Sequence, residues 1–146
     1  MNIFEDLLVG VTDVTSTLWP HPSEKPQLVN GKLRPCPGTP NCVCSEGVSP
    51  GGPVDPLAFT GTPEAAWSAL KEIIKAHGGT VQEESAGYLW STFLVPVLGF
   101  TDDVEFRLDA AAKVIHVRSS SRMGYSDLGV NRMRVEQIRK DFAKKQ

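Results

Sequence analysis

Residues 101–119, TDDVEFRLDAAAKVIHVRS, decide the fold class that the sequence predicts. Apolar and charged side chains alternate strictly in the first half, with Val104, Phe106 and Leu108 on one face and Asp103, Glu105, Arg107 and Asp109 on the other. A period of two is typical of a strand with one buried face. Residues 114–119 form a second strand-like run, so the stretch predicts an antiparallel hairpin.

The register of this hairpin follows from its charges. A two-residue loop at Ala110-Ala111 places Asp103 opposite Arg118, so that acid faces base. Because Ala-Ala is poor turn chemistry, a four-residue loop of the same parity is the alternative. Both place one set of charged side chains on one face: Asp103, Glu105, Arg107, His116 and Arg118. That face is interpreted either as a solvated surface with cross-strand ion pairs or as a cleft for acid–base chemistry.

The flanking segments supply helices and further strands. Thr62-Pro63-Glu64 is a strong helix start, and Gly78-Gly79 ends that helix. Residues 80–84 and 88–95 are strand-like, and Asn131 is predicted to cap a last helix with a buried stripe at Val135, Ile138 and Phe142. The sequence therefore predicts an α+β domain, an antiparallel sheet of about four to five strands with two helices packed on one face.

Three segments are predicted along the chain. Residues 1–19 place apolar side chains at helical spacing and predict a short amphipathic helix, which is either docked on the domain or a partner helix. Residues 20–56 form a proline-rich arm, and residues 57–146 form the core domain. A structureless segment as long as the arm is unusual unless it is functional or fastened.

The arm contains all three cysteines, Cys36, Cys42 and Cys44. A Cys36–Cys42 disulfide closing a small proline-rich loop is favoured in an oxidising compartment, and reduced structural thiols are the alternative. The spacing matches no familiar zinc ligand pair, so no metal and no cofactor are expected.

Charge and composition exclude several classes of function. The 146 residues carry a net charge of -2, which favours neither nucleic acid nor an anionic membrane. Residues 1–100 hold five Lys/Arg against ten Asp/Glu, whereas residues 101–146 hold ten against seven. No apolar run is long enough to span a bilayer, and no targeting signal is recognisable. We therefore expect a small soluble domain, and its compartment stays open: cytoplasmic, or plastid or periplasmic if a leader has been removed.

The segment 118–132 is the strongest candidate binding site. It combines three arginines, two glycines and the start of a helix, which together suit a phosphate or carboxylate. The candidate ligand-binding residues are Arg118, Arg122, Gly124, Tyr125, Asp127, Gly129, Asn131 and Arg132, together with Asp103 and His116. The competing interpretation is that Asp102, Asp103 and Asp127 satisfy the arginines internally and fasten the loop.

Two motifs carry a family resemblance. They are Pro35-Cys36-Pro37-x-x-Pro40-Asn41-Cys42-Val43-x-Ser45, and Asp102-Asp103-Val104-Glu105-Phe106 followed by the run from Val117 to Arg134. From about Gly31 to Phe142 the chain resembles the uncharacterised family called domain of unknown function 1499. The resemblance implies no settled activity, and it covers both the cysteine loop and the segment 118–132. Cys44 stands where many members have serine, so the resemblance gives it no shared role.

Three functions remain open at this point. The first is a binding module for an anionic small molecule or a partner at the segment 118–132. The second is a hydrolase or isomerase that uses Asp102 or Asp103 with His116. The third is a protein–protein interaction module that uses the N-terminal helix and the proline-rich arm. The first is preferred, because the arginines and glycines are contiguous and no complete nucleophile–base set is visible.

Overall fold

A computed structural model describes residues 25–95 and 99–146, so the predicted helix over residues 1–19 lies outside the described residues. The elements, in chain order, are β1 (Cys42–Cys44), β2 (Leu57–Ala58), α2 (Pro63–Ala76), β3 (Thr80–Ser85), β4 (Tyr88–Val95), β5 (Phe100–Asp109), β6 (Val114–Ser121) and α3 (Val130–Ala143). All the strand pairs are antiparallel. The predicted α+β class is confirmed.

The sheet has six strands, not the four to five that we expected. Its order is β1-β6-β5-β4-β3, and β2 also pairs with β6. The additional strands are β1, which lies in the proline-rich arm, and β2, which follows directly after it. They pair with different stretches of β6. Strands of three and two residues between prolines show no periodicity, and for this reason the sequence did not predict them.

Helix α2 forms as its sequence predicts. The Thr62 hydroxyl accepts a hydrogen bond from the Ala65 N–H at 3.1 Å, and Pro63 occupies the first turn. The helix ends at Ala76, and Gly78 then adopts a positive φ of 84°, the left-handed conformation that favours glycine.

Helix α3 begins differently from the prediction. Asn131 is not the capping residue, because the helix starts at Val130 after Gly129, whose φ is 83°. The Asp127 carboxylate takes over the capping role. It accepts hydrogen bonds from the Gly129 N–H at 2.9 Å and from the Asn131 N–H at 2.8 Å. The predicted buried stripe of Val135, Ile138 and Phe142 is confirmed.

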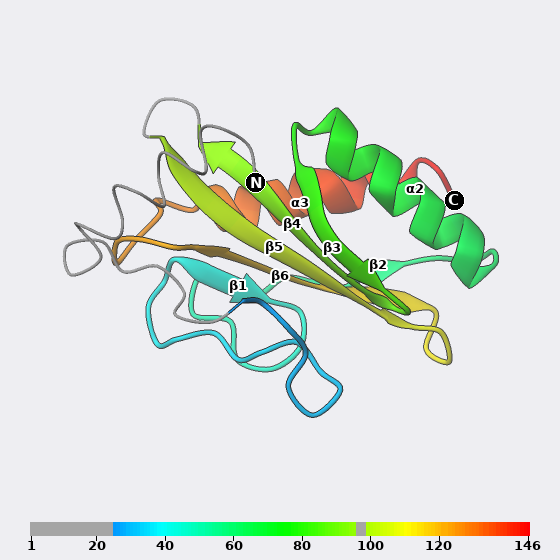
Figure 1. Cartoon of the computed structure of the whole chain (residues 1–146), viewed down its shortest axis with the longest axis horizontal. Helices are drawn as coiled ribbons and strands as arrows, with labels where there is room; N and C mark the ends of the chain where they lie inside the picture. The colour runs from blue at the N-terminus through cyan, green and yellow to red at the C-terminus, as the bar shows by residue number, and fades with distance from the viewer. Residues whose placement is uncertain (1–24, 96–98) are drawn as a thin grey trace.

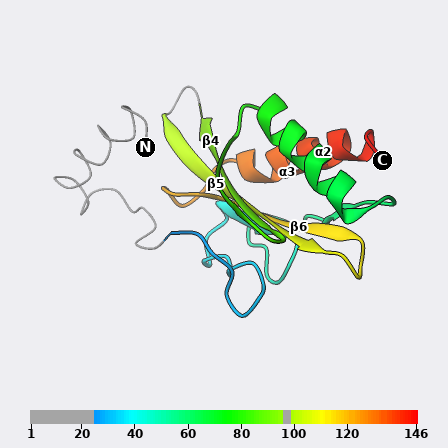
Figure 2. The ribbon, with the colours of Figure 1, turned by 45° about the vertical axis from the view of Figure 1, so that its right-hand side comes forward.

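The two helices cover one face of the sheet, and the segment from residue 25 to 56 covers part of the other, as Figures 1 and 2 show. We call these the helix-side face and the arm-side face. The core lies on the helix side, where Val104, Phe106, Ile115 and Val117 of the central hairpin pack with the buried stripes of α2 and α3. The division of the chain at residue 57 stays a prediction.

The central hairpin uses the longer loop. Asp109 pairs with Val114, so residues 110–113 form a four-residue loop, and the two-residue loop at Ala110-Ala111 was wrong. The parity was right, and therefore every apolar side chain of the hairpin lies on the expected face. The partners differ from the expected ones: Glu105 lies opposite Arg118, and Asp103 lies opposite Ser120.

The first of the two interpretations of the arm-side face is correct in part: Glu105 and Arg118 form a cross-strand ion pair, but the middle of the face is not solvated. Asp103, Glu105 and Arg118 are each at most 3% exposed. A small apolar cluster links this face to the covering segment, with Leu33 and Cys44 packed against Tyr88. The charged side chains are therefore buried in a second layer of structure, under a chain segment with little secondary structure of its own.

Candidate functional site

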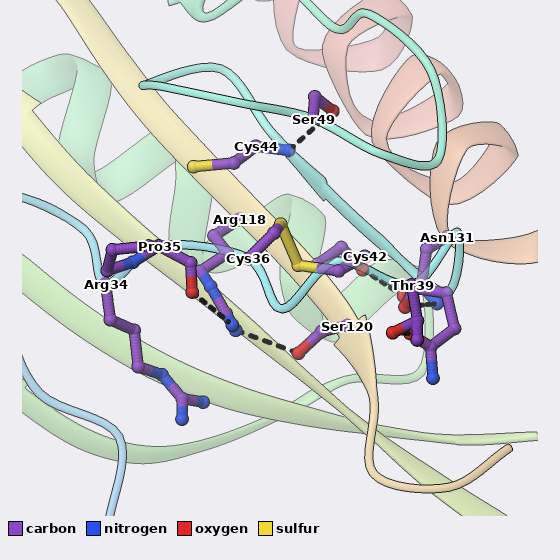
Figure 3. Close-up of a disulfide and its surroundings, with 12 residues drawn as sticks. Arg34, Pro35, Cys36, Thr39, Cys42, Cys44, Ser49, Arg118, Ser120 and Asn131 are labelled. Atoms are coloured by element: carbon purple, nitrogen blue, oxygen red, sulfur yellow. Dashed lines mark hydrogen bonds between the residues drawn. A yellow bond between two sulfur atoms is a disulfide. The ribbon is translucent and has the colours of Figure 1, made fainter. Parts of the chain in front are cut away.

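Glu105 is the centre of the buried charges on the arm side. It is fully buried and accepts hydrogen bonds from three donors: Tyr88 Oη at 2.8 Å, Arg34 Nε at 2.9 Å and Arg118 Nη1 at 3.3 Å. Burial and the neighbouring Glu105 charge raise the pKa of Tyr88, which keeps its hydroxyl a donor. Figure 3 shows Arg118 reaching from β6 to the Pro35 carbonyl, at 3.1 Å, and to Ser120, at 2.8 Å.

Asp103 binds Arg122 in the forked geometry that arginine and carboxylate prefer. Arg122 Nε lies 2.9 Å from one carboxylate oxygen and Arg122 Nη2 lies 3.0 Å from the other. Trp90 Nε1 donates to the same carboxylate at 2.9 Å. Next to them, Arg134 Nη2 lies 2.8 Å from Asp102 Oδ2, and burial raises the pKa of Asp102 in spite of that arginine.

Asn131 connects the segment 118–132 to the arm. It is fully buried, and its side-chain amide donates to Asp127 Oδ2 at 2.6 Å, Ser121 Oγ at 2.8 Å and the Asn41 carbonyl at 3.3 Å. Asn41, from the arm, donates in turn to the Gly124 carbonyl at 2.7 Å. Asn41 was not among the predicted site residues, although its place in the cysteine motif was a signal that could have identified it.

The base of the loop 122–129 is therefore held from both sides, whereas its tip is open to solvent. We define the tip as residues 123–128. Tyr125 is 71% exposed and Leu128 is 94% exposed, and Met133 on the first turns of α3 is 55% exposed. Leu128 also has a φ of 56°, a conformation that leucine rarely adopts.

The structure gives internal partners to the arginines of the predicted anion site. Arg118 pairs with Glu105, and Arg122 pairs with Asp103. The exposed Arg132 donates from Nε to the Pro53 carbonyl at 3.1 Å. At the start of α3, Asp127 occupies the place that a bound anion would take. These contacts agree with the fastening role that the sequence left open.

His116 lies far from both aspartates of the predicted acid–base pair. It is opposite Arg107, while Asp103 is opposite Ser120, four residues further along β6, or about 13 Å away at the usual rise of a strand. Its neighbour is Ser45, whose Oγ lies 3.1 Å from His116 Nδ1. Burial lowers the pKa of His116, which favours the neutral imidazole at pH 7.

Ser45 has a structural task as well. Its N–H donates to the Val117 carbonyl at 2.9 Å, and its Oγ accepts from the Val117 N–H at 2.9 Å, so its side chain extends the β1–β6 pairing. This serine lies in the cysteine motif, and sequence reasoning assigned it no role. The pairing positions it beside His116.

Two of the three cysteines form a disulfide, and the third is a free thiol. Cys36 and Cys42 form a disulfide, and Cys44 is free and buried. Burial raises the pKa of the Cys44 thiol, which donates to the Glu46 carbonyl at 3.1 Å, so the thiolate needed for nucleophilic chemistry is disfavoured. Residues 25–95 and 99–146 hold no group of three His, Cys, Asp or Glu side chains that could bind a metal ion.

The fold and the site define a small disulfide-bonded α+β domain with a charged second layer beneath its arm. The chain belongs to the family described as protein of unknown function (DUF1499), whose model matches residues 32–142, and the resemblance seen in the sequence is confirmed. No curated protein matches the chain. Neither helix of the described part of the chain is long and apolar enough to cross a membrane.

Proposed function

We propose that this protein is a binding module that recognises an acidic segment of a partner protein through the tip and the neighbouring start of α3. The observation that supports this most is Leu128. At 94% exposure and a φ of 56°, this leucine contributes almost no burial, and its backbone conformation costs about 1–2 kcal/mol relative to a right-handed one. A side chain that does not stabilise its own fold is suited to contacts with another molecule.

The exposed apolar side chains come from one short stretch of the chain. Leu128 and Met133 flank the start of α3 at the positions N′ and N4, which adjoin each other on the first turn of a helix. Tyr125 comes from the same loop, and tyrosine is enriched in binding surfaces because it offers a large contact area with few rotatable bonds. The buried amides of Asn41 and Asn131 fix the loop base, which lowers the entropy lost on binding.

The charge of this region indicates the chemistry of the ligand. Arg132 is exposed beside Met133 at the start of α3. Guanidinium groups bind carboxylates and phosphates in the same forked geometry. A peptide segment with apolar and acidic side chains therefore complements the tip. A small free anion could bind Arg132 in the same way but would make no apolar contacts.

A library of random twelve-residue peptides, selected on the immobilised full chain, tests the proposal. We expect enriched peptides to combine apolar residues with Asp or Glu. Leu128→Asn and Tyr125→Ala should each weaken binding of the enriched peptides by about tenfold, as central contacts do. The matched control is Val48→Ala, since Val48 is 80% exposed but lies in the loop after β1. Equal enrichment on wild type and Leu128→Asn overturns the proposal.

Stability measurements separate a binding defect from a folding defect. Asn tolerates the left-handed conformation better than leucine, so Leu128→Asn should keep or slightly raise the melting temperature while it weakens binding. A titration with inorganic phosphate or citrate distinguishes a free anion from a peptide. Shifts of the Arg132 signals at millimolar anion, with no peptide enriched, would favour the small-molecule form of the site.

The other two predicted functions have less support. For the hydrolase or isomerase, the separation of His116 from Asp102 and Asp103 leaves only the Ser45–His116 contact as a starting point. Ser45→Ala, assayed with generic ester substrates, would test that pair. The interaction module that would use the N-terminal helix and the proline-rich arm stays a prediction, and residues 1–24 of it lie outside the described residues.

A further inference from the structure

The disulfide fastens the arm to the edge of the sheet. Cys42 belongs to β1, is fully buried and pairs with Ser120 of β6. Cys36 lies six residues earlier, on the covering segment, and is partly exposed. The bond therefore joins a fixed strand to a segment that has little backbone hydrogen bonding of its own (Figure 3).

The three residues before Cys36 make the contacts that close the arm-side face. Leu33 N–H donates to Glu46 Oε2 at 3.0 Å. Arg34 Nε donates to Glu105 Oε2 at 2.9 Å, and the Pro35 carbonyl accepts from Arg118 at 3.1 Å. The burial of Glu105 and Arg118 thus depends on a stretch that is anchored at the disulfide.

We propose that the Cys36–Cys42 disulfide is a redox modification site: reduction by a dithiol releases residues 25–36 from the arm-side face and exposes the charges beneath them. This inference does not depend on the proposed binding function of the tip. Among the described residues, it is the only disulfide.

The exchange is balanced in atoms and electrons. A thiolate of the dithiol attacks the sulfur of Cys36, the partly exposed partner, and the bond to Cys42 breaks. Cys42 leaves as a thiolate and takes up a proton. The second thiol of the dithiol then attacks the mixed disulfide, frees Cys36 as a thiol and leaves the reagent oxidised. Two electrons and two protons have passed from the dithiol to the protein.

Physical reasons favour release after reduction. The covering segment is rich in proline, which lacks a backbone N–H donor. Within the segment, a single β-bridge joins Val29 to Lys32. Its ionic contacts bury charges, and hydration of those charges after opening recovers much of their desolvation penalty. The disulfide restricts Cys36 to the edge of the sheet. After reduction only the backbone of residues 37–41 connects the segment to β1, so the segment gains conformational freedom.

Cys44 does not supply an internal thiol for this exchange. Its pKa is raised by burial and its sulfur is held by the Glu46 carbonyl, so it lacks the thiolate character of an attacking group. An external dithiol is therefore required. The reduction potential of the surroundings then decides whether the arm is docked or released.

Hydrogen exchange on the full chain, oxidised or treated with a phosphine reductant, tests the release. We expect the amide of Leu33, which donates to Glu46 in the closed state, to exchange at least about tenfold faster after reduction, while those of β5 keep their protection. The double variant Cys36→Ser/Cys42→Ser should behave like the reduced chain without reductant, and Cys44→Ala should behave like the oxidised chain. Unchanged exchange in the arm, or loss of protection throughout the sheet, overturns the proposal.

Linkage supplies an independent test. If the disulfide stabilises the docked arm, the docked arm stabilises the disulfide to the same extent. Arg34→Gln removes the ionic contact with Glu105 and should lower the dithiothreitol concentration for half reduction by about threefold or more. The matched control is Lys25→Gln, which removes an exposed ion pair with Glu83 from the same segment. Equal midpoints for Arg34→Gln and wild type contradict the coupling.

Discussion

The two faces of the sheet are built from the same strands by different means. Phe106 and Glu105 are neighbours on β5, both are fully buried, and they point to opposite sides. The helix side surrounds Phe106 with the stripes of two amphipathic helices, and any well-fitting apolar group serves there. The arm side surrounds Glu105 with three specific donors.

The comparison shows how differently the two layers respond to change. An apolar core accepts different apolar side chains, provided that their volumes are similar. A buried charge is strict in chemistry, because removal of one partner leaves the other desolvated and uncompensated. The contacts that hold the arm therefore depend on one another, whereas each helix is held by many small and separate apolar contacts.

The largest expected effect is that of Glu105→Ala. It leaves Arg34 and Arg118 without their carboxylate, and we expect the free energy of unfolding to fall by about 3–5 kcal/mol. Phe106→Ala, on the opposite face, should cost about the same, 3–5 kcal/mol, through the cavity that it leaves. Urea denaturation of both variants measures the two values. A loss below about 1 kcal/mol for Glu105→Ala would mean that water already reaches the charges.

Gly79→Ala examines the close packing of the helix side. A methyl group at this position would overlap the Phe93 ring and would lie 2.8 Å from Ile74 Cγ2, so we expect a loss of about 1–3 kcal/mol in urea denaturation. Gly61→Ala is the matched control, because no atom lies within 4 Å of its added methyl group. Equal stability of the two variants would show that the side chains around Gly79 can move to accept the methyl group without loss of stability.

Glu46→Gln examines the arm side through pH. Burial raises the pKa of Glu46, but hydrogen bonds from Arg107 and from the Leu33 N–H outweigh burial and hold the pKa below its ordinary value of 4.5. A carboxyl with a lowered pKa contributes stability above its unfolded-state value, and this stability is lost as the pH falls through the folded-state value. The melting temperatures of wild type and variant, different at pH 7, should therefore converge as the pH falls below 4.5. A constant difference down to the lowest pH would refute this role.

Lys145→Ala should have the smallest effect. Its ion pair with Glu72 joins the end of the chain after α3 to α2 at the surface, where the side chains are 45% and 69% exposed. Such pairs contribute about 0.2–1 kcal/mol, which salt screens further. We expect a change below about 0.5 kcal/mol in low salt and none in high salt. A loss as large as that of Gly79→Ala would contradict the contrast between exposed and buried charges.

Much of the fold was predictable because local signals were strong. The Thr62-Pro63 cap, the glycines after α2 and the strict alternation of residues 103–109 each act within a few residues, and the structure confirms what they predicted. The loop length of the central hairpin was less certain, since residues 110–113 carry no glycine or asparagine to specify a turn.

The candidate site was less predictable, since its partners are distant in sequence. Arg34 reaches Glu105 across 71 residues, and Asn41 reaches Gly124 across 83. No periodic pattern connects such positions. The sequence named Arg118, Arg122 and Asp103 as site residues, but it could not tell whether their charges face a ligand or one another.

The sequence by itself determined the helices, the central strands, the parity of the hairpin and the membership of the DUF1499 family. These follow from short-range periodicity, capping and motif spacing. Only the tertiary structure decided that the charged face is covered and that the tip remains exposed. The reason is physical: a chain encodes its local geometry in neighbouring residues, whereas the burial of a charge depends on which distant segment supplies its partner.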